Sequence, residues 1–214
     1  MPEINFRPCR PDDADAAIPL IYSSGPAAFD YVFCDSAAHQ SLDFLRYAFV
    51  RGQSEFGYRQ HLAAEIDGKL VGVAALRDAG QNFAFTVAAL RDIVSFYSPA
   101  AALRTLVRGL RTERVIRTPK SGEAMLYHLG IDAEHRGGGI GTALIGQIAA
   151  RARSRSVNRL TLDVAATNPR ARELYLRLGF EMQAGRIGKL SSPYGQVCDH
   201  TAMSMRLCDG RSTA

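Results

Sequence analysis

The stretch that decides the fold is residues 129–144, which read Leu-Gly-Ile-Asp-Ala-Glu-His-Arg-Gly-Gly-Gly-Ile-Gly-Thr-Ala-Leu. An apolar strand from Ala124 to Ile131 leads into three consecutive glycines, and a helix with one apolar side follows from Gly139 to about Arg153. Glycine has no Cβ, so successive backbone N–H groups can converge on one point, and the helix N-terminus adds partial positive charge. This stretch therefore predicts a cradle for a pyrophosphate group.

Two other nucleotide-binding loops do not fit these residues. A dinucleotide-binding Gly-x-Gly-x-x-Gly motif would begin at Gly139 and Gly141, and its third glycine would fall at Leu144. A Walker loop needs Gly-Lys followed by serine or threonine, which the sequence does not contain. The loop thus points to a phosphate-bearing ligand of another kind.

A second segment follows at residues 168–180, Asn-Pro-Arg-Ala-Arg-Glu-Leu-Tyr-Leu-Arg-Leu-Gly-Phe. Asn168-Pro169 predicts a helix start, because proline is tolerated in the first turn, and Gly179 suits the position just past the helix end. Between the two predicted helices, residues 159–165 alternate apolar and polar side chains like a strand.

Further elements are expected on both sides of this region. In chain order they are a strand at 4–9, a helix from Asp12 or Asp13 to about Tyr22, a helix over 37–50, a hairpin over 61–77, and strands near 180–190 and 201–207. The order βααββ, a helical stretch and βαβαββ predicts an α/β fold, a mixed sheet with helices on both faces. With 214 residues, we expect one domain over 1–214.

The stretch before the central strand, about residues 83–118, is predicted to be a helical insertion. It reads as two helices broken at Ser98-Pro99, with apolar residues at helical spacing. It either packs on the core, or walls the acceptor site, or forms a dimer contact, and the sequence leaves these alternatives open.

Charge is unevenly distributed in a chain whose composition is otherwise that of a globular protein. The formal net charge is +5, with 47% hydrophobic and 22% charged residues. Residues 1–100 carry 8 basic and 12 acidic side chains, whereas residues 101–214 carry 18 and 9. A basic half predicts an anionic partner, either nucleic acid or a phosphate-rich cofactor.

The remaining bulk features predict a cytoplasmic protein. The chain has no apolar run of the roughly 20 residues that a membrane span needs, and its first residues have no apolar signal core. The four cysteines show no metal-site or redox spacing, so we expect reduced thiols, no metal and no membrane partner. They are Cys9, Cys34, Cys198 and Cys208.

Together the two motifs resemble the GNAT superfamily of acetyl-CoA-dependent N-acetyltransferases. Residues 136–141 match the family's Arg/Gln-x-x-Gly-x-Gly/Ala signature, and residues 168–180 match its Asn-x-x-Ala-x-x-x-Tyr-x-x-x-Gly-Phe segment. The close resemblance covers about residues 123–181. It implies a GNAT-like acyl-CoA N-acyltransferase fold, with acetyl-CoA as the acetyl donor.

The resemblance also assigns residues to the cofactor. The glycine loop would hold the pyrophosphate, the central strand would pair with the pantetheine arm, and Asn168 would bond to that arm from the next crossover. Gly130 would mark a bulge that splays the central strand from its neighbour. The residues so assigned are Leu129, Ile131, Arg136, Gly137, Gly138, Gly139, Ile140, Gly141, Thr142, Asn168 and Tyr175.

Three residues are expected to carry the chemistry. The backbone N–H of Leu129 would stabilise the oxyanion, and Tyr175 would protonate the leaving thiolate. Glu123 is the favoured general base, because some family members carry one just before this strand. The alternatives to Glu123 are His128, which has a suitable reference pKa, and water. His135 directly precedes the glycine loop and is expected to be exposed there.

The predicted activity is acetyl transfer to a primary amine by direct attack in a ternary complex. The acidic first half favours a cationic acceptor such as an amino sugar, a polyamine or a peptide amine. One alternative is a catalytically inactive CoA-binding regulatory module. Another is a nucleic-acid-binding protein, but no nucleic-acid motif is present, so we expect no nucleic acid partner. A homodimer remains open.

Overall fold

The computed structural model describes residues 3–36, 40–155 and 157–207, and a single seven-stranded sheet organises them. Its strands are β1 (Asn5–Pro8), β2 (His61–Ile66), β3 (Lys69–Asp78), β4 (Glu123–Ile131), β5 (Arg159–Ala165), β6 (Glu181–Arg186) and β9 (His200–Arg206). A separate small ribbon consists of β7 (Leu190–Ser191) and β8 (Gln196–Val197). The helices are α1 (Ala14–Ser23), α2 (Pro26–Phe33), α3 (Ser41–Arg51), α4 (Asn82–Phe96), α5 (Pro99–Thr112), α6 (Ile140–Ser154) and α7 (Pro169–Arg177).

The sheet is mixed, as the element order predicts. Its strand order is β1-β2-β3-β4-β5-β9-β6, and every neighbouring pair is antiparallel except β4 and β5. These two parallel strands are joined by α6, the crossover helix that the glycine-rich stretch opens. The loop after β4 therefore lies at the edge of the sheet where the C-terminal ends of both β4 and β5 are found.

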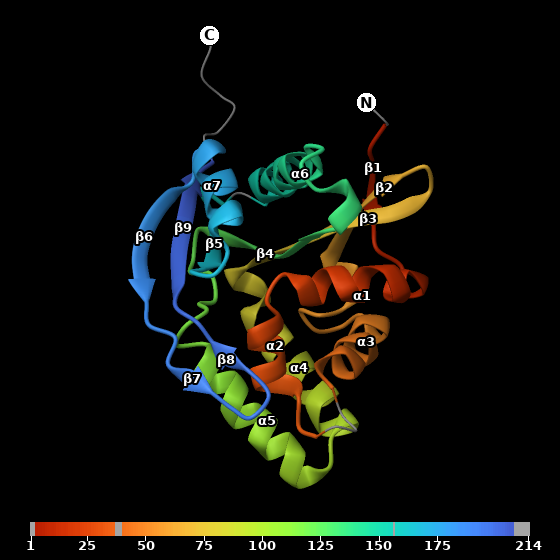
Figure 1. Cartoon of the computed structure of the whole chain (residues 1–214), viewed down its shortest axis with the longest axis vertical. Coiled ribbons are helices and arrows are strands. Elements are labelled where there is room, and N and C mark those ends of the chain that lie inside the picture. Colours follow the sequence, from red (N-terminus) through yellow and green to blue (C-terminus); the bar gives the residue numbers. More distant parts are fainter. Residues whose placement is uncertain (1–2, 37–39, 156, 208–214) are drawn as a thin grey trace.

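Helices cover both faces of the sheet (Figure 1). Helices α6 and α7 pack on one face, where Leu144, Ile148 and Leu160 are fully buried. Helices α1 to α5 lie on the other, around a second cluster that contains Phe44 and Phe49. Each strand buries alternate side chains toward each layer.

The insertion is folded and belongs to the second cluster. Helix α4 packs on α3, and α5 packs on α2 and α4. Buried Ile93, Tyr97 and Ala102 join the same core as Phe44. The expected break at Ser98-Pro99 is confirmed, but the second helix ends at Thr112 rather than near residue 117.

Two elements were missing from the sequence-based expectation. Helix α2, whose Pro26 takes the first-turn position, lies where no helix was predicted, and the ribbon of β7 and β8 interrupts the path to β9. The helix expected over 37–50 begins at Ser41, and residues 37–39 lie outside the described residues.

The parallel strands β4 and β5 separate soon after they begin. They pair only between residues 123–125 and 159–161. Beyond that point β4 carries a bulge on its β3 side, where the register slips by one residue between Tyr127 and Gly130. The bulge lies at His128, which has a φ of +52°, and not at Gly130 as the glycine suggested.

Gly130 is required for a different reason. A Cβ at this position would lie 2.1 Å from the backbone oxygen of Leu20 in α1. Helix α1 therefore crosses β4 in direct backbone contact, which only glycine permits. The glycine fixes the position of α1 beside the gap between β4 and β5.

Candidate active site

The glycine loop between β4 and α6 has the geometry of an anion cradle. Gly137 and Gly139 have φ angles of +84° and +83°, which glycine adopts without steric cost. A Cβ on either residue would meet no other atom within 4 Å. Backbone conformation, not packing, therefore demands these glycines, and the space around them is open.

The start of α6 supplies free donors to this space. Gly139 is the N-cap, and a backbone bond runs from Ala143 N to Gly139 O at 3.0 Å. The N–H groups of Ile140, Gly141 and Thr142 precede that bond and have no acceptor within the helix. The cradle thus fits a pyrophosphate, and a cavity of about 260 Å³ borders it at Gly138.

Side chains of the loop hold its shape. The Nε of Arg136 donates to the carbonyl oxygen of Ile131 at 3.1 Å. His135 Nδ1 lies 2.8 Å from a carboxylate oxygen of Asp132, three residues earlier. His135 is thereby part of the turn, and Arg136 closes the turn back onto the end of β4.

Asn168 occupies the N-cap of α7 on the far side of the gap. Its Oδ1 accepts a hydrogen bond from the backbone N–H of Ala171 at 3.1 Å. The exposed Nδ2 has no partner among the described residues. Capping therefore fixes the side chain and leaves two N–H donors for a ligand.

Tyr175 lies on α7 with its ring in the core and its hydroxyl outside it. The residue is 8% exposed and its ring contacts Phe180. No described residue bonds to its hydroxyl, which is not among the buried polar atoms that lack a partner, so the oxygen reaches accessible space. Burial raises the pKa of Tyr175 to about 12, so the phenol is protonated at neutral pH.

The bulge leaves part of β4 without ladder partners. His128 and Leu129 have no opposite residue in β3, and β5 has already diverged. Their backbone groups therefore border the gap, as the oxyanion role expected for Leu129 requires.

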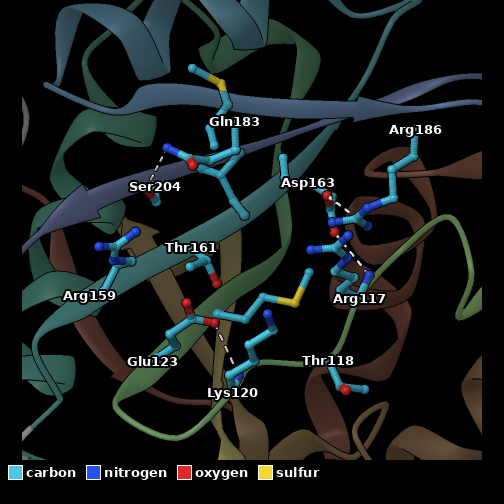
Figure 2. Close-up of a pocket in the computed structure, with 14 residues that line it drawn as sticks. Arg117, Thr118, Lys120, Glu123, Arg159, Thr161, Asp163, Gln183, Arg186 and Ser204 are labelled. Atoms are coloured by element: carbon cyan, nitrogen blue, oxygen red, sulfur yellow. Dashed lines mark hydrogen bonds and ion pairs between the residues drawn. The ribbon is translucent and has the colours of Figure 1, made fainter.

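A cavity of about 230 Å³ opens on the sheet face opposite α6 and α7 (Figure 2). Its floor comes from β4, β5, β6 and β9, and residues 117–120 after the insertion form a wall. The charged residues that line it are Arg117, Lys120, Glu123, Arg159, Asp163 and Arg186.

Asp163 is the residue of this cavity that the sequence analysis missed. Figure 2 shows it between Arg117 and Arg186. One carboxylate oxygen accepts from Arg117 N at 3.1 Å. The other, 3.6 Å from Arg186 Nη1, is buried without a hydrogen bond. Burial raises the pKa of Asp163 above its ordinary value. The sequence signal that could have identified Asp163 is an acidic side chain at a polar position of the alternating strand 159–165.

Glu123 lines the same cavity but at the other end. Its carboxylate accepts from Lys120 N at 3.1 Å, in the turn before β4. Leu129 lies six positions further along the strand, a distance of about 20 Å. The structure therefore does not bring Glu123 to Leu129, and its expected role as a general base lacks support from this geometry.

His128 is partly exposed and packs against an aromatic cluster on the side of α1 to α5. Its Nδ1 lies 3.1 Å from His61 Nε2, and the planes of the two rings are inclined by only 8°. Phe29 and Phe56 pack against the ring of His128. His128 is thus held rigidly beside the gap.

Within residues 3–36, 40–155 and 157–207 no group of three or more His, Cys, Asp or Glu side chains is arranged to hold a metal ion. In the same part of the chain, no helix has the length and apolar character needed to cross a membrane.

A splayed pair of parallel strands with an anion cradle at its open end defines an acetyl-CoA-dependent acyltransferase. The chain belongs to the acetyltransferase (GNAT) family, whose family model matches residues 29–180. It is therefore an acyltransferase, and acetyl-CoA is the donor used in this family. The resemblance inferred from the two motifs is confirmed.

Known proteins similar to this chain agree with the family. A 5-NmdU N-acetyltransferase of Pseudomonas phage PaMx11 is 41% identical over 73 residues, which are 34% of this chain and 48% of that protein. The chain thus matches about half the length of this curated relative. An N-acetyltransferase structure from Staphylococcus aureus is 17% identical, with a TM-score of 0.66 over 94% of this chain and 100% of that one.

Two further structures share the fold at similar identity. A ribosomal-protein-alanine N-acetyltransferase from Brucella melitensis is 19% identical, with a TM-score of 0.54 over 95% of this chain and 99% of that one. The Salmonella typhimurium protein yncA, solved with its cofactor acetyl-CoA, is 16% identical, with a TM-score of 0.56 over 99% and 98%.

Proposed function

We propose that this protein transfers the acetyl group of acetyl-CoA to a primary amine by direct attack in a ternary complex. One observation carries the proposal: the gap between β4 and β5 has an anion cradle at its open end and a cavity with a buried carboxylate on one face. The two substrates can therefore approach the same gap from different sides.

The donor side uses the loop and the two strands. The N–H groups of residues 137–142 bind the pyrophosphate, and the unpaired backbone from Leu129 to Ile131 bonds to the pantetheine arm. Asn168 bonds to that arm through its free Nδ2. Bound acetyl-CoA supplies an activated acyl group, a thioester carbonyl that an amine can attack.

The protein groups at the gap then handle charge and protons. The N–H of Leu129 stabilises the negative charge that develops on the carbonyl oxygen. Tyr175, protonated because its pKa is about 12, gives its proton to the departing sulfur. Direct attack is favoured over an acetyl-cysteine because burial raises the pKa of Cys9 to about 12 and also raises the pKa of Cys34, which keeps both thiols protonated.

The acceptor occupies the cavity of Figure 2, with its amine toward Asp163. The oxygen of that carboxylate that has no hydrogen bond accepts an amine N–H. Three basic side chains around the cavity, those of Arg117, Lys120 and Arg159, have no ion-pair partner among the described residues. This charge favours an acceptor that carries an acidic group besides its amine, in place of the purely cationic acceptor expected from composition.

The phage relative is a second reason to look for a polar acceptor. That protein is named a 5-NmdU N-acetyltransferase, and the cavity of about 230 Å³ limits the acceptor to a small molecule or the end of a larger one. Since the match covers about half of that protein, we propose only the chemical class: a small polar molecule with a primary amine.

A panel of amines tests this function. The protein is incubated with acetyl-CoA and one amine: glucosamine, glucosamine 6-phosphate, spermidine or a short peptide with a free N-terminus. Mass spectrometry then measures the mass of each product. We expect acetylation of an amine that carries an acidic group, with glucosamine 6-phosphate preferred over glucosamine. Binding of acetyl-CoA without acetylation of any amine would favour the inactive CoA-binding module.

A further inference from the structure

The pair of histidines beside the gap has a defined hydrogen-bond direction. His61 Nδ1 lies 2.9 Å from the carbonyl oxygen of Gly57, which can only accept, so Nδ1 of His61 carries the hydrogen. In a neutral pair, His61 Nε2 must then accept from His128 Nδ1, 3.1 Å away. The remaining nitrogen, His128 Nε2, is therefore left with a lone pair.

That nitrogen has no partner in the protein. No described residue bonds to His128 Nε2, and it is not among the buried polar atoms that lack a hydrogen bond. His61 is 1% exposed, whereas His128 is partly exposed. The free nitrogen thus faces accessible space at the position where β4 leaves β5.

The backbone aims the ring at this position. His128 has a φ of +52°, which is rare for a residue with a side chain. The strain places His128 in the aromatic cluster while its neighbour Leu129 presents backbone to the gap. Histidine at a strained site, fixed by a second buried histidine, is costly unless the ring has a function.

We propose that His128 is the general base that accepts the proton of the attacking amine, and that His61 is a positioning residue that fixes its tautomer. This proposal rests on the proposed amine acetylation. As the amine nitrogen bonds to the carbonyl carbon, its proton passes to His128 Nε2. The C–S bond breaks, the sulfur takes a proton from Tyr175, and the imidazolium and phenolate then exchange protons with water.

The surroundings keep the pair neutral. The groups facing His128 are Phe29 from α2, Phe56 from the segment after α3, Tyr127 from β4 and His61 from β2. No carboxylate of the described residues bonds to the ring. Burial first, then His61 and the positive charge of Arg77 on β3, hold the pKa of His128 well below its ordinary value. The lone pair is therefore available throughout the neutral range, and kcat falls only in acid.

Replacement of His128 tests the base. Glycine accepts a positive φ, so His128→Gly keeps the bulge and removes the ring. We expect acetyl-CoA affinity to persist, kcat to fall on the order of 10²-fold or more, and added imidazole to restore part of the rate. Imidazole on the wild-type protein is the control, and the acceptor is the best amine of the panel. His128→Asn, which also tolerates this φ, replaces the glycine variant if that does not fold.

Two results would overturn the proposal. One is a wild-type kcat in the folded variants. The other comes from long-range ¹H–¹⁵N spectra, which need no acceptor: we expect the Nδ1–H tautomer for both His61 and His128, and an Nε2–H tautomer at His128 would leave no lone pair for the amine. His61→Phe should keep an aromatic ring at this buried position but lose the fixed tautomer and lower kcat less than His128→Gly. A protein that acetylates no amine counts against the proposed function, whereas the spectra judge the histidine pair alone.

Discussion

Tyr175 combines two properties that rarely occur in one side chain. Its ring fills the core beneath α7, and its hydroxyl has no partner in the described protein. A buried phenol normally finds a hydrogen bond, as Tyr97 does with the carbonyl oxygen of Phe33 at 2.5 Å. A phenol hydroxyl without a hydrogen bond is what the proposed proton transfer to a departing thiolate requires.

Tyr175→Phe isolates this role because it removes only the oxygen. We expect kcat to fall on the order of 10²-fold, the usual size of a general-acid contribution, while the Kd for acetyl-CoA from calorimetry stays the same. Tyr97→Phe is the matched control, which should lower the melting temperature and leave kcat near wild type. A Tyr175→Phe enzyme with full kcat would return this residue to a packing role.

His61 makes a second prediction, on stability. Burial lowers the pKa of His61 to about 4, from an ordinary value near 6.5. Between these values the unfolded chain binds a proton that the folded protein does not, so the free energy of unfolding falls as the pH drops through this range. The loss is on the order of 3 kcal/mol at about pH 4.

Urea unfolding of the wild type and His61→Phe from pH 7 to pH 4 measures this effect. The variant should lose less stability over the range, because its phenylalanine cannot take a proton. Carboxylates contribute equally to both proteins and cancel in the comparison. Parallel curves for the two proteins would show that His61 titrates normally in the folded state.

At the scale of elements, the loop that opens α6 is the part with a directly measurable ligand. Gly139→Val should abolish acetyl-CoA binding, because a β-branched residue strains the +83° φ and fills the open cradle. Gly146→Ala is the control on the same helix, where a Cβ meets no atom within 4 Å and alanine is the better helix former. Calorimetry that finds wild-type affinity in folded Gly139→Val would contradict the cradle.

Sequence predicted this element well because its signals are local. Glycines, a capping position and helical periodicity all lie within residues 129–144, and the same holds for the α7 segment. The bulge was placed wrongly, at Gly130 instead of His128, because a close backbone contact with α1 also demands glycine. Only the folded structure shows that His128, and not Gly130, adopts the strained backbone conformation.

The acceptor side was less predictable because it is built from distant segments. Asp163 acquires its partners from residues 117 and 186, and His128 acquires its partner from residue 61. Neither pairing leaves a trace in local spacing. Glu123 was predicted to be the general base from its position in the sequence alone. In the structure, the length of β4 separates Glu123 from Leu129.

The insertion contributes to the core, and its last residues line the cavity proposed to bind the acceptor. Phe85, Ile93 and Tyr97 are buried, so removal of residues 83–118 would expose the interior rather than trim a loop. Its acceptor role is tested by point changes. Arg117→Ala should raise the acceptor KM up to about 5-fold, the most that an exposed ion pair usually contributes, with an unchanged KM for acetyl-CoA.

Arg114→Ala is the matched control for that experiment. Arg114 lies three residues earlier, is exposed and does not line the cavity. Both variants are assayed with glucosamine 6-phosphate or the best acidic amine of the panel. Equal acceptor KM values for the two variants would remove the segment after α5 from acceptor recognition.

At the scale of the whole molecule, the two faces of the sheet contribute different parts of the proposed site. The face of α6 and α7 supplies Tyr175 and the anion cradle, and the face of α1 to α5 supplies the histidine pair and the neighbouring cavity. The strands β4 and β5, which pair only over their first residues, lie between the two faces. Direct transfer needs both substrates there together, so initial rates should give intersecting double-reciprocal lines, and parallel lines would indicate an acetyl-enzyme.

The most direct test of the central claim is mass spectrometry of the amine panel with purified protein and acetyl-CoA. We predict that at least one primary amine gains a single acetyl group, that one free thiol appears for each acetyl group transferred, and that Tyr175→Phe slows both equally. A protein that binds acetyl-CoA at the glycine loop and yet leaves every amine unmodified would contradict the account.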